Sequence, residues 1–554
     1  MAANRLRCLC EWMLRRRFPA VPIAIAVLLG VPSLWNGLQG DDLSLYNIVR
    51  DEPAVAGLFG DPWNPFSFLD GDPARTRQLI DAGWLPWWSD PECRASFWRP
   101  VTGLTHVLDF RVWPRWPVVM HAQSLAWYAL MVWVVATLYR RLIGARLPLW
   151  TAALAALLFA VDDSHAMPVG WLANRNALVA GVFGVLALLA HDLWRRDGWR
   201  WGAVVAPVAL LAALLSKEAA VSVGGYLLAY ALFIERGPWR RRLLSLLPCL
   251  LVGIAWYAAY RVLGHGSARS SVYIDPGQDP LRYAWQAVRH APLLLCGQWG
   301  LPGSEVALLA SRTAFWGCWA WAVAYVVLVA VVLLPLVARE RVARFWALGM
   351  ALSLLPACAA FLHDRLLMFA GIGAMGLLAQ WLGGRVEGAA WVPTGRAWRG
   401  LAKAFAGVAI VVQLVLAPVQ FVAGSMGMKG VGALLGRQLA TTPSDEAVTQ
   451  QTLVFANSMS ALADAIWVQP RLYRKERVPA RILRLSPSAA PATLLRTDER
   501  TLVVRPRGGY LPPQGAWYDA GRGPAFSPVY VLRSMDSLFR SEEHPLRLGD
   551  RVEL

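Results

Sequence analysis

NALVAGVFGVLALLAHDLWRR, residues 176–196, combines the two signals that decide the fold. An apolar run over 176–193 is followed directly by the basic pair Arg195 and Arg196. A helix needs roughly 20 apolar residues to cross a bilayer, and cytoplasmic loops of membrane proteins are enriched in lysine and arginine. The segment is therefore predicted to span a membrane and to end on its cytoplasmic side.

The same pattern recurs from end to end. Hydrophobic residues make up 56% of the 554 residues, and the 29 tryptophans are typical of a chain with many membrane interfaces. The sequence predicts an α-helical polytopic membrane protein with about eleven transmembrane helices. We expect them near residues 18–36, 117–139, 148–161, 176–193, 202–215, 219–234, 243–263, 315–338, 345–361, 365–383 and 401–424.

Arginine clusters occupy every second connection between these segments. They include Arg15–Arg17, Arg140 with Arg141, Arg195 with Arg196, Arg240–Arg242, Arg339 with Arg341, and Arg396 with Arg399. The positive-inside rule places these connections and the N-terminus in the cytoplasm, and the C-terminal region outside. The net charge of +18 is thus a topology signal, and no nucleic-acid partner is expected.

The first apolar segment has a second interpretation, as a cleaved signal peptide, because it has a basic start and an apolar middle. No small-x-small cleavage site is well placed before Asp41. Residues 37–116 form a long outer loop under either interpretation.

Polar residues that are costly beside a membrane gather on the predicted outer face. The first outer loop contains GDDLSLYN (40–47), with Asp41 and Asp42, and ends in FWRP (97–100), and further outer connections carry His165, Arg175, Lys217, Glu218, His363 and Arg365. Each charge costs about 2.5–3.5 kcal/mol at a span centre and less near its ends. Simpler roles are snorkelling for the cations and helix capping for the aspartates. Asp162 and Asp163 form a similar pair without an assigned role.

These groups fit one kind of chemistry. A carboxylate at the outer boundary can act as general base toward an acceptor hydroxyl. Arginine, lysine and histidine can hold a phosphate and stabilise the charge that develops as it departs. A phosphate with a long apolar tail would place its head group at this depth, which predicts group transfer from a lipid-linked phosphate donor.

At these residues the chain resembles the GT-C superfamily of integral-membrane glycosyltransferases, in particular the protein O-mannosyltransferase-like branch. The matching pieces are GDD after the first span, FWRP, HAMPVGWLANRNAL (165–178) and LLSKEAA (214–220), in the same order and on the same face. The match covers roughly residues 20–235. No tetratricopeptide pattern follows the membrane part, which distinguishes the chain from the repeat-bearing relatives.

The resemblance implies transfer of a sugar from a polyprenyl-phosphate carrier on the extracytoplasmic side, usually with inversion. Carried over by position, the base is Asp41 or Asp42, with Asp42 slightly favoured. Phosphate and substrate contacts fall on Arg99, Arg175 and Lys217, with Glu218 orienting Lys217. His165, His363 and Arg365 are further outer-face candidates. The acceptor is a protein, a lipid or a polysaccharide, and the membrane is expected to be a bacterial inner membrane.

No cofactor is required by this scheme, because the cations can supply the positive charge. A divalent ion bound by the aspartates is an alternative that some members of the superfamily use. The glycines Gly371, Gly373 and Gly376 are expected to let neighbouring helices approach closely rather than to act in catalysis.

Composition divides the chain into three parts. Residues 1–424 form the transmembrane domain, with outer loops at 37–116 and 264–314, and residues 425–449 form a Gly-rich linker. Short β-type runs in 450–554, including TLVFAN, RILRLS, TLLRTDERTLVVRP and PVYVLR, predict a small β-rich extracytoplasmic domain.

Two other function classes stay open. A transporter or lipid flippase would carry polar or broken helices near the bilayer midplane and, often, an internal repeat. No convincing repeat is present. A non-catalytic membrane scaffold that presents the C-terminal domain is the third alternative.

Overall fold

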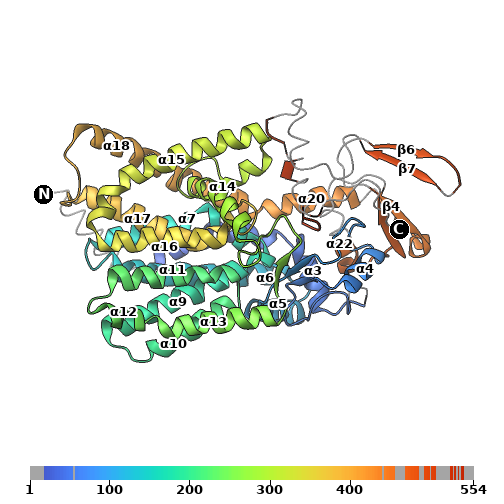
Figure 1. Ribbon diagram of the computed structural model, residues 1–554, viewed down its shortest axis with the longest axis horizontal. Coiled ribbons are helices and arrows are strands. Elements are labelled where there is room, and N and C mark those ends of the chain that lie inside the picture. The colour runs from blue at the N-terminus through green and yellow to red at the C-terminus, as the bar shows by residue number, and fades with distance from the viewer. Residues whose placement is uncertain are drawn as a thin grey trace.

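The architecture is that of a long helical bundle with additional elements at one end. The computed structural model describes residues 18–53, 56–439, 442–443, 445–455, 468–485, 492–499, 501–506, 525–527, 530–531, 535, 538–541 and 544. Figure 1 shows the bundle helices side by side, with α12 (Trp239–Leu244) at one end and α3 (Asp41–Val49) at the other.

The apolar segments of the sequence form the bundle. Its helices are α2 (Ala20–Gly30), α6 (Pro117–Leu142), α7 (Leu149–Val161), α9 (Asn176–Asp197), α10 (Gly202–Leu214), α11 (Ser222–Ala229), α13 (Leu247–Val262), α15 (Arg312–Arg339), α16 (Arg341–Ala357), α17 (Met368–Val386), α18 (Arg396–Val411) and α19 (Ala417–Ser425). Each of the predicted spans coincides with one of these helices or with a run of them. A single turn, η1 (Val31–Trp35), extends α2.

Length and composition mark five stretches as able to cross a membrane. They are Pro117–Leu142, Leu172–Asp197, Trp239–Val262, Arg312–Arg339 and Arg396–Ala433, and the bent pair Leu149–Val161 and Asp163–Gly170 would make a sixth. The chain is an integral membrane protein. The number of about eleven spans stays a prediction, because several of the remaining apolar helices are shorter than a bilayer requires.

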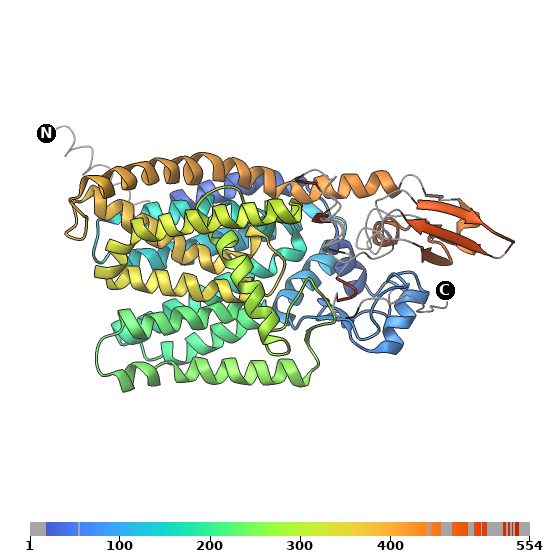
Figure 2. The same cartoon turned by 45° about the horizontal axis from the view of Figure 1, so that its top comes forward.

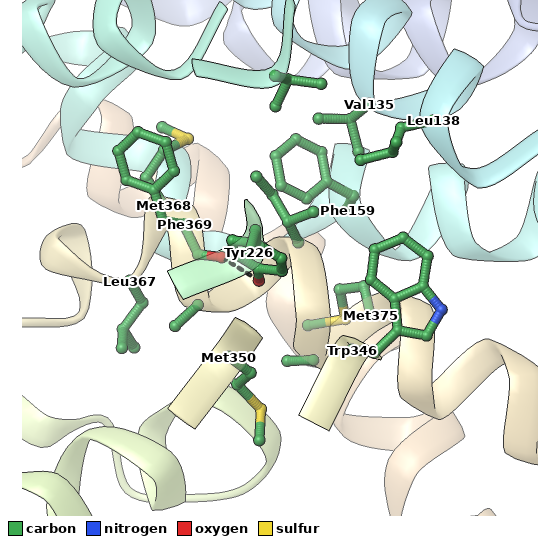
Figure 3. Close-up of a cluster of buried hydrophobic side chains, with 14 of the residues drawn as sticks. Val135, Leu138, Phe159, Tyr226, Trp346, Met350, Leu367, Met368, Phe369 and Met375 are labelled. Atoms are coloured by element: carbon green, nitrogen blue, oxygen red, sulfur yellow. Dashed lines mark hydrogen bonds between the residues drawn. The ribbon is translucent and has the colours of Figure 1, made fainter. Parts of the chain in front are cut away.

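Glycines allow the closest helix contacts in the core. A Cβ on Gly373 would lie 2.6 Å from the carbonyl oxygen of Trp346, and one on Gly376 would lie 2.9 Å from the Trp346 ring. Figure 3 shows this region, where the Tyr226 hydroxyl donates to the Phe369 carbonyl at 2.7 Å. The packing role predicted for these two glycines is confirmed.

The two outer loops meet in a small sheet at the α3 end of the bundle. Strands β1 (Ser67–Asp70) and β2 (Arg94–Ser96) come from the first loop, and β3 (Gly266–Ala268) comes from the second. The order is β1-β2-β3, with antiparallel neighbours. Helices α4 (Pro73–Asp81) and α5 (Pro100–Val112) complete the first loop. In Figure 2, α14 (Pro280–Trp299) of the second loop runs across the bundle rather than along it.

The C-terminal region is only partly β-structured. Strands β4 (Thr452–Phe455) and β5 (Arg481–Arg484) pair in parallel, and β6 (Ala492–Arg496) and β7 (Leu502–Pro506) form an antiparallel hairpin. Helix α20 (Gly427–Leu439) lies in the predicted linker, and α22 (Val468–Arg474) lies between β4 and β5. The strand expected over 528–533 is wrong at its two described residues, Tyr530 and Val531, which are helical.

Much of the domain expected over 450–554, and the N-terminal arginines Arg15–Arg17, lie outside the described residues. The described part of the C-terminal region packs on the first loop. Val468, Leu472 and Ile482 are buried in one hydrophobic cluster with Leu79 and Trp88. The two regions, far apart in sequence, therefore share a core.

Candidate functional site

A cavity of about 490 Å³ lies where the two outer loops meet the bundle. Its wall includes residues of α3, α13, the end of α16 and the short turns η4 (Glu218–Val221) and η7 (Asp364–Leu366). Nine residues with charged or amide side chains line it: Asp41, Arg99, Asn174, Asn176, Lys217, Glu218, Arg261, Asp275 and Arg365. The fold thus brings together five of the nine site residues that the sequence predicts.

Asp41 lines this cavity as the first residue of α3. The helix begins after Gly40, whose φ of +54° is a conformation that side-chain-bearing residues rarely adopt. Its carboxylate makes no hydrogen bond or ion pair with the described residues, although it is partly buried. Burial raises the pKa of Asp41, and the positive charge of Arg365 opposes that increase. A carboxylate left without a protein partner is available to a ligand.

Asp42 does not line the cavity. Its side chain is 1% exposed and accepts hydrogen bonds from the backbone N–H groups of Gln39 (3.0 Å) and Ala173 (2.7 Å). Burial raises the pKa of Asp42 to about 7, while the two backbone hydrogen bonds oppose the increase. Asp42 therefore ties α3 to η3 (Leu172–Asn174), and of the two aspartates only Asp41 faces the space where a substrate would fit.

Arg99 and Glu218 form an ion pair in the cavity wall. The Arg99 Nη2 lies 2.7 Å from Glu218 Oε2, and Nε of the same guanidinium lies 3.0 Å from that oxygen. The guanidinium also stacks on the Phe97 ring, with 4.4 Å between its carbon and the ring centroid. Glu218 thus pairs with Arg99, whereas the sequence suggested that it orients Lys217.

Lys217 and Arg365 are the cations of the cavity that have no carboxylate bound to them among the described residues. Lys217 Nζ donates to Asn174 Oδ1 at 3.3 Å. Burial, and then the charges of Arg99 and Arg365, lower the pKa of Lys217 well below its usual range. The Arg365 guanidinium lies over the rings of Trp171 and Phe361, 5.1 and 5.0 Å from their centroids, and its Nε has no described partner. An anion in the cavity would satisfy both.

The side chain of Arg175 is bound by buried partners outside the cavity. It is fully buried, and its Nη1 pairs with Asp109 Oδ2 at 2.5 Å while Nη2 donates to the Met120 carbonyl at 2.6 Å and Nε to Ser124 Oγ at 2.9 Å. It does not line the cavity. Asp109 was not predicted as its partner, because a single aspartate in THVLDFRV gives no local signal of a buried ion pair.

The two histidines also lie outside the cavity wall. His165 is fully buried, and its Nδ1 lies 3.3 Å from the Tyr128 hydroxyl. His363 Nδ1 accepts from the Arg365 backbone N–H at 3.3 Å at the start of η7. Burial and the Arg365 charge lower the pKa of His363 to about 3, so this ring is neutral at physiological pH.

Tyr273 is a cavity residue that the sequence did not indicate. It belongs to SSVYIDPG in the second outer loop, and its ring packs against Phe97. Burial raises the pKa of Tyr273, the positive charge of Arg365 opposes that increase, and the negative charge of Asp41 adds to it. Its place opposite α3 depends on the pairing of β3 with β2, which joins loops far apart in the chain.

Much of the remaining wall is apolar. Trp256 and Tyr260 of α13 line it, together with Val221, Tyr257 and Leu355, which are 44%, 49% and 46% exposed. The cavity therefore combines a charged end near α3 with an apolar side that includes exposed side chains.

Comparison with known proteins gives short matches in sequence and broad ones in fold. No family model matches the chain. Over 159 residues the chain is 28% identical to protein O-mannosyl-transferase Tmtc1 of Drosophila melanogaster, covering 28% of this chain and 18% of that protein. Over 143 residues it is 29% identical to protein O-mannosyl-transferase TMTC3 of Mus musculus, covering 25% and 15%. The matches span less than a fifth of these curated relatives.

Two solved structures match this chain over about four fifths of its length, each with a TM-score below 0.5. ArnT from Cupriavidus metallidurans bound to undecaprenyl phosphate has a TM-score of 0.42 at 15% identity, over 81% of this chain and 84% of that chain. The oligosaccharyltransferase AglB from Archaeoglobus fulgidus, in complex with an inhibitory peptide and a dolichol-phosphate, has a TM-score of 0.43 at 13% identity, over 82% and 64%. Over the two matched stretches of sequence the chain is similar to protein O-mannosyl-transferases. The resemblance carried by its motifs is thus confirmed.

Proposed function

We propose that this protein is an inverting glycosyltransferase, which moves a sugar from a polyprenyl-phosphate carrier to an acceptor hydroxyl on the extracytoplasmic side. One observation carries the proposal: a single cavity joins Asp41, Lys217 and Arg365 to an apolar wall that includes the exposed side chains of Val221, Tyr257 and Leu355. A carrier with a charged phosphate head and an apolar hydrocarbon tail matches the charged and apolar parts of this cavity. The names of the curated relatives make mannose the first sugar to test.

In the proposed reaction Asp41 is the general base. It takes the proton of the acceptor hydroxyl as that oxygen attacks the anomeric carbon from the face opposite the phosphate, and the bond between that carbon and the phosphate oxygen breaks. The phosphate departs on its lipid. A single displacement inverts the configuration at the anomeric carbon.

Lys217 and Arg365 are the proposed phosphate ligands, because their charges are not neutralised by a bound carboxylate among the described residues. Positive groups fixed where charge develops in the transition state lower its energy. Arg99 has a carboxylate partner already, so we assign it to holding Glu218 and the wall in place. Adding a chelator to the same assay tests whether a divalent ion takes part.

The extracytoplasmic side is supported by the distribution of charge along the bundle. Arg240–Arg242 of α12 lie at the end opposite the α3 region (Figure 1). Cytoplasmic connections carry the excess of basic residues. We therefore propose that the α3 end, with the cavity, faces away from the cytoplasm.

The test is transfer of radiolabelled sugar from a polyprenyl-phosphate donor by purified protein. We expect Asp41→Asn to lower the rate by about 10²–10⁴-fold, the usual contribution of a positioned base. Asp42→Asn keeps an oxygen for one of its two backbone donors and should lower the rate less. Undiminished transfer by Asp41→Asn would remove the base assignment, and no transfer by the unchanged protein from any donor would favour the transporter or scaffold alternatives.

A further inference from the structure

Two asparagines in the cavity wall stand on either side of Arg175. Asn174 ends η3, Asn176 begins α9, and both line the cavity although each is only 3% exposed. The intervening arginine is occupied by Asp109 and does not line the cavity. Asn174 and Asn176 therefore belong to the wall of a cavity that Arg175 does not line.

Each amide has one hydrogen-bonding atom in use and one left over. The ammonium of Lys217 has only donors, so the atom facing it at 3.3 Å is Asn174 Oδ1, and the Nδ2 group of Asn174 is left without a described partner. Asn176 Nδ2 donates to the Ala173 carbonyl at 2.9 Å, which leaves Asn176 Oδ1 without a described partner. The wall thus offers one unused donor and one unused acceptor.

A buried polar atom without a hydrogen bond destabilises a folded protein, so it is expected to find a partner. The chemistry of the missing partner follows from the two atoms. A phosphate with ionised oxygens could satisfy the donor but not the acceptor, and a hydrocarbon tail could satisfy neither. A hydroxyl group both accepts and donates, so a polyhydroxylated head group can satisfy both.

We propose that Asn174 and Asn176 form a subsite for the hydroxyls of the sugar, beside the phosphate ligand Lys217. The subsite rests on the proposed function, which supplies a donor that carries both sugar and phosphate. In this arrangement Lys217 links the two parts of the ligand, because it holds the Asn174 oxygen while its charge faces the phosphate. Recognition of the sugar then lies in residues different from those that recognise the carrier.

The experiment compares two lipids on the purified full-length protein in nanodiscs. One lipid is undecaprenyl phosphate, and the other is the same carrier loaded with mannose, glucose or arabinofuranose. The unchanged protein should bind at least one loaded carrier more tightly than the bare carrier. Asn174→Ala and Asn176→Ala should each weaken binding of that loaded carrier by about 3- to 10-fold, as expected for one lost hydrogen bond, with bare-carrier affinity unchanged.

Lys217→Gln is the matched control, because it removes a cation from the same wall and should weaken both lipids. Unchanged binding of bare carrier by the asparagine variants also shows that they are folded. The subsite is overturned if these variants bind the loaded carrier as tightly as the unchanged protein does, or if they lose affinity for both lipids equally. If the unchanged protein binds neither lipid, the proposed function fails and the subsite with it.

Discussion

At the scale of single residues, the difference between two neighbouring aspartates comes from what surrounds each one. Asp42 accepts two backbone hydrogen bonds and is closed off, while Asp41, one position earlier, faces the cavity. From the sequence GDD, Asp42 was slightly favoured as the base. The sequence could not separate the two aspartates, because the direction of a side chain at a helix start depends on tertiary contacts such as that of Asp42 with Ala173. Asp162, from the similar acidic pair Asp162 and Asp163, is 2% exposed and does not line the cavity. It accepts hydrogen bonds from the Ser164 backbone N–H and from Gln298 Nε2.

The charge of Arg365 should control the pH at which Asp41 can act as a base. Burial raises the pKa of Asp41 above the ordinary 3.8, and Arg365 lowers it. A base works in its deprotonated form, so kcat/KM should fall as pH drops through a pKa that lies above the ordinary value. Arg365→Gln removes the lowering effect, and we expect the acidic limb of the pH profile to move to higher pH.

Arg261→Gln is the control for that profile. Arg261 lines the same cavity but pairs with Asp275 at 2.5 Å, so its removal should leave the limb in place. If the acidic limb of the Arg365→Gln profile is unchanged or moves to lower pH, Asp41 does not titrate in the active form of the enzyme.

At the scale of elements, α3 is held at both ends by the C-terminal region. Near its start, Met428 of α20 lies against Gly40, and a Cβ on Gly432 would overlap the side-chain amide of Gln39. Near its end, Asn47 Nδ2 donates to Gln469 Oε1 of α22 at 2.6 Å. The helix that presents Asp41 thus contacts residues that lie about four hundred positions later in the chain.

Weakening the contact between α22 and α3 should slow the reaction. Gln469→Leu removes the side-chain partner of the buried Asn47 amide and leaves only the longer bond to the Gln469 carbonyl. A small displacement of a catalytic group can lower a rate by up to about 10²-fold. We expect kcat to fall about tenfold with little change in the KM for the donor, and backbone hydrogen exchange in α3 to become faster. Both effects should appear together if α22 positions α3.

Lys475→Ala is the control at the edge of the same contact. Its ion pair with Glu52 involves a lysine side chain that is 71% exposed, and such pairs contribute about 0–1 kcal/mol. Exchange in α3 should therefore stay as it is. Unchanged exchange and unchanged kcat in Gln469→Leu would contradict a positioning role for α22.

At the scale of the whole molecule, the length of the apolar runs predicted the helical bundle well, because it is a local property of the chain. Every predicted apolar segment is helical, and the arginines of α12 lie at the end opposite α3. The ion pair of Arg175 with Asp109, the place of Tyr273 and the core shared by Leu79 and Val468 could not be predicted. Each depends on contacts between distant segments, which leave no periodic pattern in a single sequence.

The apolar cavity wall that reaches the surface at Val221, Tyr257 and Leu355 has a kinetic consequence. A lipid donor that enters through this side never leaves the bilayer, so it meets the enzyme by diffusing in two dimensions. The reaction should then show surface dilution: at a fixed total amount of donor, adding inert phospholipid to the vesicles slows transfer. A rate that follows the bulk donor concentration instead, whatever its mole fraction in the membrane, would mean that the head group arrives from the water. If surface dilution holds, membrane composition becomes a regulator of this protein in its own right.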